Sequence, residues 1–230
     1  ADAQLTDYRS HGTVTGATWD TGNNEIYQTG LVKGRKAMIF EGNTKRIVIG
    51  NPEPLKLNHL TLFAWVSTLS GTTSFDSIIA KSEAYAFGID DGVVKGYNWG
   101  AGSGWRSGSK VINDGALHLI CMTITNNTTG QFYVDGVADG SSFAWVILNQ
   151  NSDLWIGNTS LATSEGFDGI VFETGIYNTV LSPSEITTLY NNGIPYDATN
   201  VKNTNLVGYW KNQGADTWTD YSKQISFGTS

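Results

Sequence analysis

The chain has very little cysteine and little proline. Its only cysteine, Cys121, excludes an internal disulfide. Because it lies in the apolar run 117–124, we expect a small buried hydrophobic residue rather than a nucleophile, since an apolar site raises the thiol pKa. There are only 4 prolines against 27 glycines in 230 residues, and this balance favours a fold with many tight turns.

Basic charge is also scarce, with 14 Lys and Arg against 21 Asp and Glu and a formal net charge of −7. No basic stripe is present to neutralise phosphates, which argues against nucleic acid or an anionic membrane surface as a partner. No apolar run reaches the length of a membrane span, so we expect no membrane insertion. The low charged fraction of 15% leaves Asn, Thr, Ser and Gly as the polar residues. This composition predicts an extracellular, cell-surface or virion protein.

Short segments with β-branched or aromatic residues recur along the chain, and turn residues separate them. Asp90–Gly92 and Asp135–Gly136 are typical hairpin turns, because glycine readily adopts a positive φ. A length of 230 residues fits one large all-β domain. The predicted strands are Lys36–Phe40, Arg46–Ile49, Leu60–Thr68, Ser77–Lys81, Ala84–Ile89, Val93–Trp99, Leu117–Asn126, Gly130–Val134, Ser142–Leu148, Asp153–Ile156 and Ile170–Tyr177.

One short helix is predicted near the C-terminus, directly after the last of these strands. Ser182 is a suitable N-cap, Pro183 suits the first helical position, and Glu185 can close a capping box. Gly193 is expected to end the helix.

Together these segments resemble the laminin-G-like domains of the concanavalin A-like lectin/glucanase superfamily. The resemblance implies a two-sheet antiparallel β-sandwich of the jelly-roll type, which usually binds sugars and only sometimes cleaves them. Leu117 departs from the family pattern, which has tryptophan there. The segments that carry the resemblance, in chain order, are A-M-I-F-E-G-N (37–43), L-T-L-F-A-W-V (60–66), L-H-L-I-C-M-T (117–123), Q-F-Y-V-D-G (131–136), L-W-I-G (154–157) and the strand–turn–helix segment 168–186.

The family's opening strand stands at the wrong end of this chain. The sequence L-V-G-Y-W (206–210) resembles that strand, whereas the segment that normally follows it appears at residues 7–13. We therefore predict one laminin-G-like domain over residues 1–230, closed by 206–221, in which Val207, Tyr209 and Trp218 complete the sheet at its N-terminal edge. The alternative is that the tail begins the next unit of a tandem array.

The segment 95–110 is the best candidate for a binding site, because aromatic rings there alternate with glycines that leave flat rings exposed. Sugars stack C–H faces on such rings and pair hydroxyls with amides and arginine. The alternative is that the two tryptophans cover the end of the sandwich, since tryptophan is highly buried on average. The candidate carbohydrate-binding residues are Tyr97, Asn98, Trp99, Trp105 and Arg106, with Tyr85 and Trp145 placed on the same face on weaker grounds.

An enzymatic function has weaker support. Glu165, Asp168 and Glu173 are the nearest approach to a glycosidase acid pair, but their spacing does not place acid and nucleophile on one strand face. A polysaccharide lyase needs a cation and a base, roles that Arg106, Tyr97 and His118 can be assigned. The resemblance places His118 at a structural strand position.

The resemblance also implies a structural calcium ion between Asp7 and Glu173, since hard cations take carboxylate oxygens. The alternative is a solvated turn aspartate and a strand glutamate with a hydrogen-bond partner.

The favoured hypothesis is a non-catalytic, lectin-like module that binds surface glycans, as part of a phage virion or tail or of a bacterial surface protein. One alternative is a polysaccharide lyase or glycoside hydrolase. The other is a structural or protein-docking module with a large subunit interface, in a homo-oligomer or a tandem array.

Overall fold

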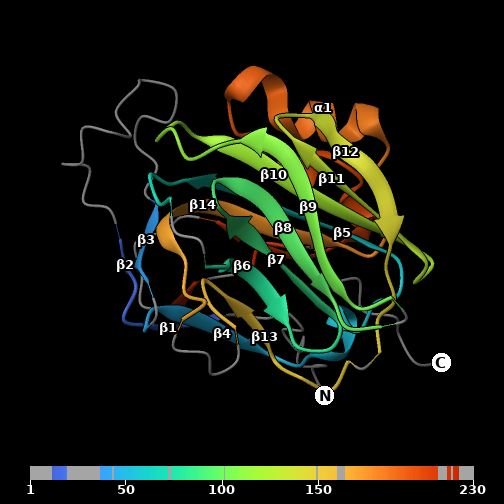
Figure 1. The fold of residues 1–230 in the computed structure, drawn as a ribbon, viewed down its shortest axis with the longest axis horizontal. Coiled ribbons are helices and arrows are strands. Elements are labelled where there is room, and N and C mark those ends of the chain that lie inside the picture. The colour runs from blue at the N-terminus through green and yellow to red at the C-terminus, as the bar shows by residue number, and fades with distance from the viewer. Residues whose placement is uncertain are drawn as a thin grey trace, which may run out of the picture.

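The computed structural model describes residues 12–19, 37–42, 44–71, 74–100, 102–148, 150–159, 164–211, 217–218 and 220–222. These residues form two antiparallel sheets stacked face to face with one short α-helix outside them (Figure 1). The predicted all-β sandwich is therefore confirmed.

Sheet A has eight strands and carries the candidate site at one edge. Its strands lie in the order β16 (Thr217–Trp218), β1 (Gly12–Thr15), β4 (Arg46–Gly50), β13 (Leu154–Ile156), β6 (Asp76–Lys81), β7 (Tyr85–Asp90), β8 (Val93–Asn98) and β9 (Gly104–Val111).

Sheet B faces it and contains the longest strand of the sandwich, β14 (Asp168–Tyr177). Its order is β12 (Val137–Ala144), β11 (Thr129–Val134), β10 (His118–Thr125), β5 (Leu60–Ser67), β14 (Asp168–Tyr177), β3 (Met38–Glu41) and β2 (Thr18–Trp19), and β15 (Leu206–Lys211) also pairs with β14.

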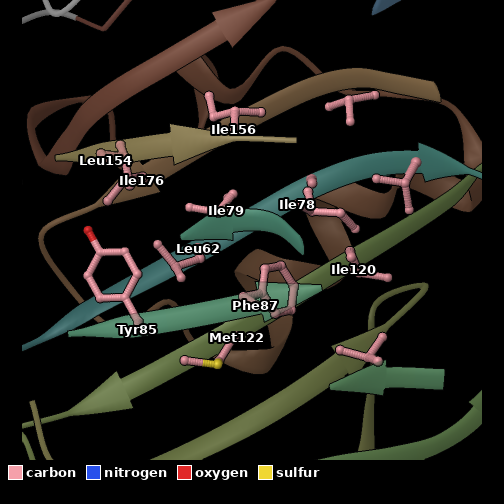
Figure 2. Packing of buried hydrophobic residues seen from close by; sticks show 14 of the residues in the cluster. Leu62, Ile78, Ile79, Tyr85, Phe87, Ile120, Met122, Leu154, Ile156 and Ile176 are labelled. Atoms are coloured by element: carbon pink, nitrogen blue, oxygen red, sulfur yellow. The ribbon is translucent and has the colours of Figure 1, made fainter. Parts of the chain in front are cut away.

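The main core fills the space between the two sheets. Period-two alternation directs one set of side chains from each strand inward, and Figure 2 shows some of these residues, among them Leu62, Ile79, Phe87 and Ile120. The burial of this apolar surface is the main source of stability for such a sandwich.

A second apolar layer covers the outer face of sheet B. The helix α1 (Pro183–Tyr190) packs there, and Tyr190 stacks on Trp65 with ring centroids 5.9 Å apart. The short 3₁₀ turns that follow the helix, η3 (Asn191–Gly193), η4 (Ala198–Asn200) and η5 (Asn203–Asn205), continue the chain back to β15. In Figure 1, α1 lies beyond β10–β12, on the opposite side from β13 and β4. No described helix contributes to the apolar cluster on the outer face of sheet A.

The C-terminal segment supplies strands to both sheets. β15 pairs with Glu173–Tyr177 of β14, beside β3, which pairs with Asp168–Val171 on the same edge. β16 pairs instead with β1 in sheet A, with Trp218 opposite Gly12. The prediction that both pieces complete one sheet is wrong, since β15 belongs to sheet B and β16 to sheet A. That residues 1–230 form one domain remains a prediction.

Most predicted strands are present within one or two residues of their expected bounds. Ser142–Leu148 is wrong: the strand spans Val137–Ala144, because the Asp135–Gly136 turn starts its return strand at once. β9 was missed as a strand, although its Trp105 and Arg106 were singled out.

The predicted helix is confirmed with both halves of its capping box. The Ser182 hydroxyl accepts a hydrogen bond from the Glu185 backbone N–H, and the Glu185 carboxylate accepts one from the Ser182 backbone N–H. The helix ends earlier than expected, since Asn191 rather than Gly193 takes the left-handed cap conformation with φ 44°.

Cys121 is fully buried in the second apolar layer, and burial raises the pKa of its thiol well above the ordinary value. The predicted role of a small hydrophobic residue is confirmed. Among the described residues there is no helix with the length and apolar character of a membrane span.

Candidate functional site

The candidate site lies on the outer face of sheet A, at the β8–β9 edge. Tyr97 of β8 is the direct cross-strand neighbour of Trp105 of β9 and, on its other side, of Ala86 of β7. On β8 the flanking Gly96 and Asn98 are buried, whereas Tyr97 is partly exposed. The period of two therefore turns Tyr97 and Trp105 away from the core.

The rings on this face contact one another in an aromatic cluster made of Phe75, Tyr97, Trp99 and Trp105. Tyr97 makes edge contacts with Trp99 and Trp105, with ring centroids 5.1 and 5.0 Å apart, and Trp105 contacts Phe75 at 4.8 Å. Beneath them Ala80 and Ala86 are only 2% exposed. Mutual contact holds the rings in place, which lowers the entropy lost when a ligand binds.

Trp105 is the outermost ring of the aromatic cluster, at 44% exposure. A sheet edge that presents an indole of this exposure, with the other rings packed behind it, can offer a flat apolar surface to a ligand. Polar groups lie next to it: the Lys95 ammonium is 5.2 Å from the Trp105 ring centroid and forms an ion pair with Asp90 at 2.5 Å. The face therefore combines ring stacking with hydrogen-bonding groups.

Two of the predicted binding residues support this face from behind. Asn98 is fully buried, and its Oδ1 accepts hydrogen bonds from the backbone N–H groups of Gly100 and Val146 at 3.1 and 3.0 Å. These bonds hold the loop after β8 against the segment after β12, so the expectation that Asn98 lies on the exposed face is wrong.

Arg106 also differs from its expected position. It pairs with Gly96, on the face of the sheet opposite to Trp105, and its guanidinium donates to the carbonyl oxygens of Gly102, Trp105 and Ala144 at 2.5, 3.0 and 3.3 Å. The side chain fixes the turn that carries Trp105 and does not lie beside the ring.

Tyr85 is wrong as a surface residue. It is fully buried in the main core, and Figure 2 shows it within that cluster together with Leu62, Leu154 and Ile176. Tyr85 is adjacent to the outward-facing Ala86, so the alternation of the strand turns it inward. Trp145 is likewise fully buried, and its indole N–H donates to the Ala84 carbonyl at 3.2 Å.

Three residues of this face were missed from the sequence: Phe75, Trp155 and Arg46. Phe75 precedes β6 and contacts the ring of Trp105. Trp155 lies on β13, partly exposed between the fully buried Leu154 and Ile156, with the Arg46 guanidinium 5.1 Å from its ring centroid. The buried–exposed–buried pattern of β13 is the signal that places Trp155 outward, but it covers only three residues.

The residues proposed for catalysis are spread over the fold. Glu173 is buried on β14 of sheet B beside the Tyr209 hydroxyl, and Asp168 is exposed at the start of the same strand. Glu165 accepts a hydrogen bond from the Thr159 hydroxyl at 2.5 Å. Tyr97, Arg106 and His118 lie on the outer face of sheet A, its opposite face and sheet B, respectively. The lyase constellation is not formed.

His118 belongs to a separate polar cluster that joins β10 to the β11–β12 turn. Its Nδ1 hydrogen bonds with Asp135 at 2.8 Å, its Nε2 with Asp114 at 3.1 Å, and Asp135 also accepts from Lys110 at 2.6 Å. Burial lowers the pKa of His118, but the hydrogen bonds with Asp135 and Asp114 outweigh it and raise that pKa above 6.5.

This cluster predicts a loss of stability as the pH rises. Because the folded-state pKa of His118 exceeds the unfolded value of 6.5, the protonated ring stabilises the fold fully below pH 6.5, and this contribution disappears as the pH passes the folded-state value. We expect the difference in unfolding free energy between the wild type and His118→Gln to shrink as the pH rises from about 6.5 through the raised folded-state pKa of His118. Urea unfolding of both proteins across this range measures it, and a difference that grows with pH would contradict the assignment.

The calcium prediction can be tested only at Glu173, because Asp7 lies outside the described residues. Glu173 is 1% exposed, and its Oε2 accepts a hydrogen bond from the Tyr209 hydroxyl at 2.6 Å. Within the described ranges no three carboxylate, histidine or cysteine side chains gather as metal ligands. These residues do not fit a calcium site by themselves, and an ion shared with Asp7 remains a prediction.

Comparison with known proteins gives one family and several similar folds. The family model described as the concanavalin A-like lectin/glucanases superfamily, of the laminin G type, matches residues 41–187. No curated protein matches the chain.

Among solved structures, domain 4 of AbnA, an extracellular arabinanase from Geobacillus stearothermophilus, in complex with arabinotriose, is similar at 23% identity and a TM-score of 0.55, covering 78% of this chain and 87% of that domain. The CBM40 domain of the Ruminococcus gnavus IT-sialidase, bound to α2,3-sialyllactose, is similar at 12% identity and a TM-score of 0.53, covering 67% and 96%. The binding domain of Paraclostridial Mosquitocidal Protein 1 is similar at 15% identity and a TM-score of 0.57, covering 80% of this chain and 48% of that one. At these identities the likeness establishes the fold alone.

Proposed function

We propose that this chain, which belongs to the laminin G-like family of the concanavalin A-like lectin/glucanase superfamily, is a non-catalytic module that binds glycans on the outer face of sheet A. The single observation that carries the proposal is the exposed ring of Trp105, held by Tyr97 and Phe75 on a face that no described helix covers. The solved structures with a similar fold include domains bound to arabinotriose and sialyllactose, which supports a sugar as the ligand class.

The polar neighbours of the aromatic cluster suit a sugar better than an apolar partner. Ser107, exposed on the same face of β9, is the cross-strand neighbour of Lys95, and the Lys95–Asp90 ion pair lies beside it. A pyranose that stacks its C–H face on Trp105 can pair its hydroxyls with these groups. An apolar peptide would bury the ion pair without compensating bonds, which is costly.

We extend the proposal to the setting of the module. A shallow stacking site binds each sugar weakly, so display in several copies supplies the avidity that function requires. An extracellular or cell-surface protein, or a virion fibre, offers such display, and the low charge of the chain and the similar extracellular domain support this setting.

The test is binding to a glycan array that includes polysaccharides, arabinotriose and α2,3-sialyllactose, followed by titration calorimetry. We expect a signal for the wild type that Trp105→Ala weakens about tenfold or more, as the loss of a stacking ring predicts. Val137→Ala is the matched control, because Val137 is 69% exposed on sheet B and away from the aromatic cluster. A blank array, or equal binding by Trp105→Ala with an unchanged circular dichroism spectrum, would overturn the proposal.

A further inference from the structure

We infer that the site extends across sheet A to a second stacking position at Trp155, so that the ligand is an internal stretch of an extended glycan chain rather than a single terminal sugar. The inference rests on the proposed function and deepens it. It depends on the strand register, which places the exposed indole of Trp105 and the partly exposed indole of Trp155 in one line.

The line runs at right angles to the strands and is unbroken through five of them. Trp155 of β13 is the direct neighbour of Ala80, Ala80 of Ala86, Ala86 of Tyr97, and Tyr97 of Trp105. Four steps between neighbouring strands of a sheet cover about 19 Å. One step is close to the length of one pyranose in an extended chain, so a ligand that touches both indoles needs several sugar units.

Aromatic rings cover the middle of the line. Ala80 and Ala86 are only 2% exposed there, Phe75 is 5% exposed, and the partly exposed rings of Tyr97 and Trp99 pack against the small cluster that these three form. The apolar surface between the two indoles is therefore formed by partly exposed aromatic rings, and it suits the C–H faces of successive sugars.

The Trp155 end has its own polar group. The Arg46 guanidinium lies 5.1 Å from the Trp155 ring centroid, with its Nε buried and its side chain partly exposed. At the other end the Lys95 ammonium lies 5.2 Å from the Trp105 ring centroid. Each indole thus has a partly exposed cation beside it, and the terminal N–H groups of such cations can donate to the hydroxyl or carboxylate oxygens of a sugar.

The structural alternative is that Arg46 and Trp155 only hold β4 and β13 together. A cation–π contact of this kind is worth about 0.5–1 kcal/mol at an exposed site. If the alternative holds, the loss of Trp155 lowers only the stability of the fold. If the second stacking position exists, the loss of Trp155 lowers only the affinity for long ligands. Ligand length therefore separates them.

The experiment uses oligosaccharides, from disaccharide to hexasaccharide, prepared by partial hydrolysis of the polysaccharide that binds on the array. We expect the affinity of the wild type to rise about tenfold between the disaccharide and the hexasaccharide, because a second ring is engaged. Trp155→Ala should remove this rise and leave disaccharide binding unchanged, whereas Trp155→Phe should keep part of it. Trp105→Ala should weaken every length.

The outcomes distinguish this inference from the function it rests on. If short oligosaccharides bind through Trp105 but affinity does not increase with length, or if Trp155→Ala weakens all lengths equally, the second position is overturned and glycan binding stands. If neither the array nor any oligosaccharide gives a signal, the proposed function fails, and the second position fails with it.

Discussion

Replacing Trp210 with alanine is expected to lower the free energy of unfolding by about 3–5 kcal/mol, the usual cost of truncating a large core side chain to alanine. Trp210 is fully buried on β15 and belongs to the main core between the sheets. The substitution leaves a cavity that the two sheets cannot close without losing their register.

The size of this effect follows from the position of β15, which pairs with β14 in sheet B. Trp210 contributes to the main core, whereas the adjacent Tyr209 contributes to the second apolar layer and donates its hydroxyl to Glu173 at 2.6 Å. Asp220 accepts a hydrogen bond from the Tyr209 backbone N–H at 2.9 Å and so ties the chain after β15 to this strand. The C-terminal strand therefore connects both layers of the sandwich.

Chemical unfolding followed by far-ultraviolet circular dichroism measures the effect of Trp210→Ala. Val207→Ala on the same strand is the control, because Val207 is only partly buried against the main core, and we expect a cost of about 1 kcal/mol for its lost methyl groups. Equal losses in the two variants would show that β15 is an appendage to the sandwich rather than part of its core.

Local sequence signals predicted the parts of the fold that local chemistry decides. The Ser182–Glu185 capping box is formed by residues three positions apart, and the Asp135–Gly136 turn needs only positive φ at both residues, which they adopt at 51° and 80°. The strand Leu60–Ser67 is buried on both faces, so its continuous apolar run was a sufficient signal.

The sequence did not predict β9 as a strand, because most of its residues have a low β-propensity. Its sequence, G-W-R-S-G-S-K-V, is mostly small and polar, and it is a strand because it pairs with β8 at the edge of sheet A. Such pairing is a tertiary effect, and the β-propensity of the residues in one segment carries no information about it. β12, at the edge of sheet B, has the same character.

The site was predicted only in part, because its membership depends on which face of the sheet each side chain occupies. Rings among glycines indicated Tyr97, Trp99 and Trp105, and these three do share a face. Which neighbours join them depends on the alternation of each strand, and a shift of one residue exchanges the two faces. In 85–89 the large residues Tyr85, Phe87 and Ile89 alternate with Ala86 and Gly88, and this pattern does contain the signal that Tyr85 points inward.

Gly157→Ala is expected to be strongly destabilising for so small a substitution, with a loss of about 2–5 kcal/mol. Gly157 follows β13 with φ +83°, a conformation that costs an alanine about 1–2 kcal/mol. A Cβ at this position would also fall within the ring of Phe40, which is fully buried. Forcing extra volume into a packed core adds about 1–3 kcal/mol.

Gly50→Ala separates the two causes, because Gly50 has φ +85° and a Cβ there would meet nothing within 4 Å. We expect this control to lose only the backbone cost of about 1–2 kcal/mol. Adding Phe40→Leu to Gly157→Ala should recover part of the steric loss, since substitutions at residues in contact are not additive. If Gly50→Ala and Gly157→Ala have equal unfolding midpoints, Phe40 does not press on Gly157, and the packing of β13 against β3 is looser than the structure shows. That result would also weaken the fixed register through β13 on which the position of Trp155 depends.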